Sequence, residues 1–106
     1  MRVLLDECVP RALRSDIPGD EVKTVAEAGW AGVKNGEFLR LAASGFDLLI
    51  TVDRNLEYQQ SFVGLSLAVI IIDVPSNDVA VLRSLMPAVV AAIAHAKPGM
   101  VTHVGE

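Results

Sequence analysis

Acidic residues follow two apolar stretches of the sequence at the same relative position. Asp6 and Glu7 come directly after apolar residues 3–5, and Asp53 follows residues 48–52, in which Thr51 is the single polar residue. In a parallel α/β sheet the strands end at one common edge, where ligands bind. If the two strands are neighbours, Asp6 and Asp53 lie close together. We therefore predict that they share one site.

The chemistry that suits such a pair is binding of a divalent metal ion. Two carboxylates 4 Å apart repel by about 4 kcal/mol at an effective dielectric constant near 20. A Mg²⁺ or Mn²⁺ ion held by two or three carboxylates and several waters relieves this repulsion. Because successive strand residues point to opposite faces, we expect Asp6 to face the site and Glu7 to point away. The alternative is that the acids only lie in loops or cap the following helix.

Further polar residues lie close enough in the sequence to contribute to the same site. Glu37 falls in the first turn of a helix expected over 36–44, where an acid also simply complements the helix dipole. Lys34 and Arg54 are candidates for contact with a phosphate or with the acids, although solvation is the default for both. Asn55 either offers a side-chain oxygen or shapes the turn.

Apolar stretches alternate with segments of helical periodicity along the chain. Such alternation predicts right-handed βαβ crossovers and a parallel sheet. Pro87 is expected to kink or split the last helix, because it removes one backbone hydrogen bond. The expected strands are 3–5, 21–24, 47–52, 67–72 and 100–104, and the expected helices follow Pro10, Asn35, Asn55 and Asp78.

Composition restricts the class of protein. The 106 residues are 52% hydrophobic and 21% charged, which predicts one globular α/β domain over residues 1–106. The net charge of −4 excludes the broad basic surface of a dedicated nucleic-acid-binding protein, whereas a metal-dependent nuclease remains consistent with it. A single cysteine, Cys8, excludes an intramolecular disulfide and favours a cytoplasmic location. The longest apolar run, 67–72, is too short for a membrane span.

Three pieces of the sequence resemble a known family. They are VLLDECVP at 3–10, GWAGVKNGEFL at 29–39 and LLITVDRNL at 48–56. With them, essentially the whole chain resembles the small PIN-like domains of bacteria, which are related to VapC-type toxin ribonucleases. The resemblance implies a three-layer α/β/α sandwich with a mainly parallel central sheet.

The resemblance also implies an activity. PIN domains cut RNA by metal-assisted hydrolysis, with acids after the first strand, on a mid-chain helix and after a later strand. Those positions match Asp6, Glu37 and Asp53, which would bind Mg²⁺ or Mn²⁺ and activate a water molecule. An antitoxin protein and a homodimer are the implied partners. At the place of a further acid in PIN nucleases this sequence has Asn55.

Two other functions fit the same residues. A receiver-like phosphoacceptor domain also places paired acids after its first strand and an Asp after its third, but it needs a lysine after its last strand. Residues 101–106 contain no lysine. The second alternative is a catalytically silent PIN-like binding module, in which Asp6 and Asp53 are structural.

Overall fold

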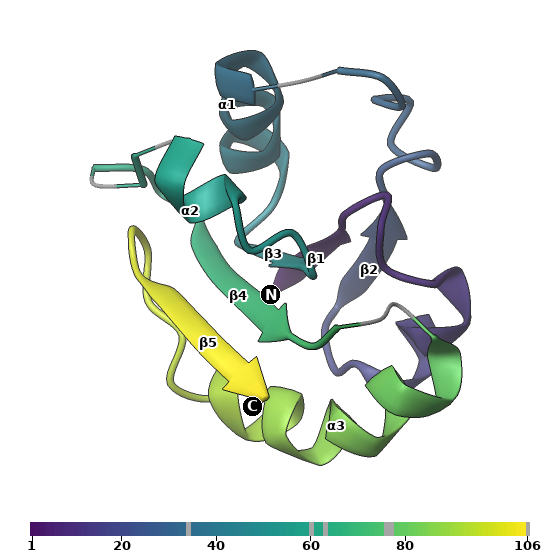
Figure 1. Ribbon diagram of the computed structural model, residues 1–106. Coiled ribbons are helices and arrows are strands. Elements are labelled where there is room, and N and C mark those ends of the chain that lie inside the picture. Colours follow the sequence, from purple (N-terminus) through teal and green to yellow (C-terminus); the bar gives the residue numbers. More distant parts are fainter. Residues whose placement is uncertain (34, 60, 63, 76–77, 106) are drawn as a thin grey trace.

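Five short parallel strands form one sheet in the order β2-β1-β3-β4-β5 (Figure 1). The computed structural model describes residues 1–33, 35–59, 61–62, 64–75 and 78–105, so Lys34 lies outside the described residues. The strands are β1 (Arg2–Leu5), β2 (Glu21–Thr24), β3 (Leu48–Thr51), β4 (Ala68–Asp73) and β5 (Val101–Gly105). Each neighbouring pair is parallel, as the alternation of strands and helices predicts.

Helical segments connect the strands and cover both faces of the sheet. They are the 3₁₀ helix η1 (Arg11–Asp16), α1 (Asn35–Gly45), α2 (Leu56–Gln59) and α3 (Val79–Ile93). Helix α3 begins at the predicted cap, since Asp78 accepts hydrogen bonds from two backbone N–H groups of the first turn. Pro87 lies inside α3, which continues to Ile93, so the helix is not split there.

Alternating residues of the apolar strands build two separate cores. In β4, Ile70 and Ile72 face the core that Leu82 of α3 and Leu13 of η1 complete. Val69 and Ile71 face the other core, which α1 and α2 cover. The three central strands are almost wholly buried, because they are packed on both faces. The chain therefore has the predicted three-layer α/β/α architecture.

The last crossover differs in hand from the others. Both η1 and α3 lie on one face of the sheet, and Figure 1 shows them on the same side. The β1–η1–β2 connection advances toward one edge of the sheet, whereas β4–α3–β5 advances toward the opposite edge. Crossovers on one face that advance in opposite directions have opposite hands. The prediction that every crossover is right-handed is therefore wrong, although about 98% of such connections are.

No helix in the described part of the chain is long and apolar enough to cross a membrane.

Candidate functional site

Asp6 and Asp53 follow two strands that are direct neighbours in the sheet. Leu5 of β1 pairs with Ile50 of β3, which confirms the predicted adjacency. The chain leaves β1 toward β2 on one side and later returns to β3 on the other, so the strand order reverses here. In open α/β sheets this switch point at the carboxyl edge is the preferred place for a ligand. The two acids therefore stand where the fold favours binding.

Thr51 joins the two acids. Its side chain is fully buried, and its hydroxyl donates a hydrogen bond of 2.8 Å to Oδ2 of Asp6. The same oxygen accepts the backbone N–H of Asp53 at 3.0 Å. Sγ of Cys8 lies 3.4 Å from it, and because the hydroxyl proton points to Asp6, the thiol is the donor in this contact. One buried hydroxyl thus fixes the position of Asp6 relative to the start of the Asp53 loop.

The surroundings of the Asp6 carboxyl disfavour its ionised form. Burial raises its pKa above the ordinary value of 3.8, and the negative charges of Asp53 and Glu7 raise it further. The hydrogen bonds from Thr51 and from the backbone N–H of Glu7 oppose this rise without cancelling it. The charge of Asp53 is thus one of the smaller causes of the raised pKa of Asp6. A cation at this place would favour the ionised form of Asp6.

Glu7 lies with Asp6 in a turn and not on a strand. Strand β1 ends at Leu5, and a turn follows in which the carbonyl of Asp6 accepts the N–H of Val9 at 2.9 Å. Strand alternation consequently does not apply to residues 6 and 7. Both side chains line one pocket, and Oε1 of Glu7 is held by the backbone N–H of Gly32 at 3.0 Å. Asp53 is not among the residues that line this pocket, so the expectation that only Asp6 faces the site shared with Asp53 stays a prediction.

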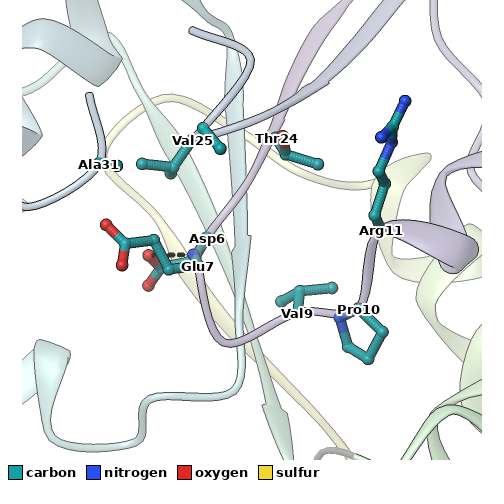
Figure 2. Close-up of a pocket in the computed structure, with 9 residues that line it drawn as sticks. Asp6, Glu7, Val9, Pro10, Arg11, Thr24, Val25 and Ala31 are labelled. Carbon is teal, nitrogen blue, oxygen red and sulfur yellow. Dashed lines mark hydrogen bonds between the residues drawn. The ribbon is translucent and has the colours of Figure 1, made fainter. Parts of the chain in front are cut away.

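The pocket lies beside the acids, at the carboxyl ends of β1 and β2. Its volume is about 410 Å³, within the range of small-molecule sites. Figure 2 shows the two carboxylates on the side nearest Ala31 and Arg11 at the opposite side. The wall is otherwise mostly apolar; the lining residues are Asp6, Glu7, Val9, Pro10, Arg11, Thr24, Val25, Ala26 and Ala31.

The remaining candidate residues have fewer contacts with Asp6 and Asp53 that would hold them in the site. Glu37 is exposed in the first turn of α1. The described ranges contain no group of three or more His, Cys, Asp or Glu side chains able to hold a metal ion, so its role as a third ligand stays a prediction. The backbone N–H of Asn55 donates to Oδ1 of Asp53 at 3.0 Å, so the Asp53 side chain closes this turn and the role of the Asn55 side chain stays a prediction. Arg54 is exposed beside them.

Thr51 is the residue of the site that sequence reasoning missed. A hydroxyl inside an otherwise apolar buried strand was the available signal, because a buried polar group must be hydrogen-bonded. Its partner could not be read from the sequence, since Asp6 lies 45 positions away.

The fold and site together define an α/β/α sandwich with a carboxylate pair at its topological switch point. Comparisons with protein-family models, with curated proteins and with solved structures give no match.

Proposed function

We propose that this protein is a metal-dependent ribonuclease of the PIN-like kind. The observation that carries the proposal is that Asp6 and Asp53 follow neighbouring central strands, with one buried hydroxyl bonded to the Asp6 carboxylate and to the backbone N–H of Asp53. Paired carboxylates at a switch point suit metal-assisted hydrolysis. That the substrate is RNA rests on the resemblance of residues 3–10, 29–39 and 48–56 to PIN-like domains.

The donor set fits a hard divalent cation. Mg²⁺ uses one or two carboxylates and keeps several waters, and Asp6 with Asp53 supplies that number. The raised pKa of Asp6 also fits, because the repulsion behind part of this shift is what a cation would relieve. When bound, Mg²⁺ or Mn²⁺ supplies Lewis-acid stabilisation and lowers the pKa of a bound water. Glu37 is the proposed third ligand.

The protein's own residues hold and orient the reacting groups. Thr51 and the N–H of Glu7 each bind one oxygen of Asp6, which fixes the plane of that carboxylate. The N–H of Asn55 does the same for one oxygen of Asp53. The pocket beside them would accept a nucleotide next to the scissile phosphate, and the exposed Arg11, whose guanidinium lies 3.8 Å from Glu27, would turn to a phosphate oxygen. A cytoplasmic location, an antitoxin partner and a homodimer belong to the same proposal.

One observation favours the receiver-like alternative. The strand order β2-β1-β3-β4-β5 is the flavodoxin-like order, which receiver domains share. The absence of lysine from residues 101–106 argues against it. Incubation with a small phosphodonor distinguishes the two functions, because a stable acylphosphate on Asp53 would establish the receiver-like one.

A nuclease assay tests the proposal. Structured RNA is incubated with Mg²⁺ or Mn²⁺ and the wild type, Asp53→Asn or Asp20→Asn. Asp20 is a matched control because it precedes β2 at the amino edge of the sheet and pairs with the chain's N-terminus. We expect Asp53→Asn to lower the rate at least about 100-fold, since a metal ligand is lost, and Asp20→Asn to leave it unchanged. Equal cleavage by wild type and Asp53→Asn would exclude this mechanism.

Calorimetric titration with Mn²⁺ separates the enzyme from a silent binding module. Saturable binding that weakens in Asp53→Asn supports the metal site independently of any activity. No saturable binding in the wild type would favour the silent module.

A further inference from the structure

A second cluster of titratable groups lies away from the acidic pair. His103 of β5 places Nδ1 2.7 Å from Oδ2 of Asp73, the last residue of β4. Its other ring nitrogen, Nε2, lies 2.8 Å from Oε1 of Glu57 in α2. The three side chains are partly exposed and come from three elements that are distant in the sequence. The ring of His103 thus lies between two carboxylates.

Counting protons determines the charge of this ring. A neutral imidazole carries one N–H and one acceptor nitrogen, whereas an ionised carboxylate only accepts. Two hydrogen bonds to two carboxylates therefore require the imidazolium form. In the neutral form, one ring nitrogen would direct its lone pair at a carboxylate oxygen. Because each carboxylate occupies a different ring nitrogen, the arrangement is a cross-link and not a chelate for a metal.

Glu57 lies on a less firmly held element than Asp73. His103 and Asp73 lie on neighbouring strands, whose parallel register holds their backbones together. Glu57 belongs to a helix of only four residues, and a helix this short depends on tertiary contacts. Leu56, which is 7% exposed, supplies one such contact, and the hydrogen bond that His103 donates to Glu57 supplies another. Loss of the ring proton therefore weakens the attachment of α2 to the sheet, while β4 and β5 stay paired.

Helix α2 is directly connected to the loop that carries Asp53. The carbonyl of Asp53 accepts the N–H of Leu56 at 3.3 Å, and the carbonyl of Asn55 accepts the N–H of Tyr58 at 3.0 Å. The loop and the first turn of α2 are thus one hydrogen-bonded unit. A shift of α2 would therefore move the Asp53 loop through these two hydrogen bonds and the chain between them.

We propose that His103 is a positioning residue and a pH-sensitive cross-link, whose imidazolium fixes α2 on the sheet and thereby the loop of Asp53. The charged groups that face the ring are Glu57 from α2 and Asp73 from β4. The proposal requires no nuclease activity and is independent of the proposed function. It links the protonation of His103 to the position of α2, an effect that does not depend on the protonation of Asp6 or Asp53.

The direction of the pH response follows from the two contacts. The hydrogen bond with Glu57 raises the pKa of His103 above its ordinary value of 6.5 against the effect of desolvation, and Asp73 raises it further. A raised pKa in the folded state means that the cross-link contributes fully below the pKa of the unfolded chain. Its contribution is lost as the pH rises through the raised pKa.

Titration of the ring nitrogens by NMR tests the cross-link directly. The wild type is compared with Glu57→Gln and Asp73→Asn, and His95, which lies outside the cluster, serves as the internal control. We expect the pKa of His103 to fall in both variants while the His95 signal titrates as before. An unchanged pKa of His103 in Glu57→Gln would overturn the proposal, because the bond to α2 would then be without consequence.

Amide hydrogen exchange tests the weakened attachment of α2. The protection of the Leu56 and Tyr58 amides, relative to intrinsic exchange, is measured across the titration of His103 in the wild type and in His103→Gln. We expect a fall of about two- to fivefold in the wild type, the size typical of a partly exposed ion pair, and a flat profile in the variant. A step of the same size in His103→Gln, or none in the wild type, would refute the mechanism.

Discussion

Replacing Thr51 by valine tests how the acidic site is held together. Valine has nearly the shape of threonine, so the substitution removes the buried hydroxyl without opening a large cavity. Asp6 then loses the donor at Oδ2, and the N–H of Asp53 loses its acceptor. Both groups lie at the partly buried base of the site, so water does not fully replace either hydrogen bond.

The expected cost follows from these two bonds. A hydrogen bond to a charged group contributes about 1.5–3 kcal/mol, and an ordinary one about 1 kcal/mol. Because Asp53 itself is exposed, water partly replaces the second bond. We expect Thr51→Val to lower the free energy of unfolding by about 2–3 kcal/mol near neutral pH. For a domain of this size the melting temperature falls by roughly 10–20 °C.

Urea unfolding followed by tryptophan fluorescence measures this cost. Trp30 is the only tryptophan, and it packs edge-on against Phe46 at 5.7 Å, so its emission reports on the folded core. Thr51→Ser is the matched control, because it keeps the hydroxyl and loses only a buried methyl group, at about 1 kcal/mol. The difference between the two variants isolates the hydroxyl.

The cost of Thr51→Val must also depend on pH. The Thr51 hydroxyl lowers the pKa of Asp6, so its removal raises that pKa further. The cost is therefore largest where Asp6 is ionised and declines as the pH falls through its pKa. Unfolding at about pH 7 and at about pH 3.5 tests this. If Thr51→Val is as stable as Thr51→Ser at both pH values, the hydroxyl does not hold the site and the reasoning is refuted.

Three further predictions concern single contacts. Asp53→Asn removes a neighbouring charge, so carboxyl NMR should show the pKa of Asp6 falling toward 3.8; an unchanged pKa would mean that the two acids do not interact. Gly105→Ala should cost about 1–2 kcal/mol in urea unfolding, because φ is +122° and the new Cβ would lie 2.5 Å from the carbonyl oxygen of Asp73; a neutral result would contradict this geometry. Asp78→Ala should lower stability by about 1 kcal/mol through loss of the α3 cap, and Asp78→Ser, which can still cap, should retain most of it; equal losses would exclude the cap as the cause.

The sequence was sufficient to predict the strands and the adjacency of the two strands that carry Asp6 and Asp53. Strands buried on both faces must be continuously apolar, which is why β1, β3 and β4 stand out within one or two residues of their ends. The acids after β1 and β3 followed from the same pattern. Their adjacency needed only the assumption that these two strands are neighbours, which the structure confirms.

Other features depend on register and on the choice of face, which local patterns do not encode. The cluster around His103 exists because β5 pairs with β4 so that His103 lies opposite Ile71, two residues before Asp73. Single-residue alternation on β5 does not predict that register. The orientation of Glu7 depends on a turn that begins after Leu5, where strand periodicity ends. The hand of the last crossover depends on α3 packing against η1, a contact between distant segments.

The all-parallel pairing has a consequence for the order in which this chain can fold during synthesis. Strand β4 is the most apolar strand of the sheet, yet one of its edges is covered only by β5, which is made about thirty residues later. Until β5 pairs, β4 presents unpaired backbone groups at an open edge, which is a template for association with other chains. Early contacts cannot shorten this interval, because each parallel pairing requires a complete crossover. Premature release of the chain before Val101 would therefore favour aggregation over a partly folded monomer.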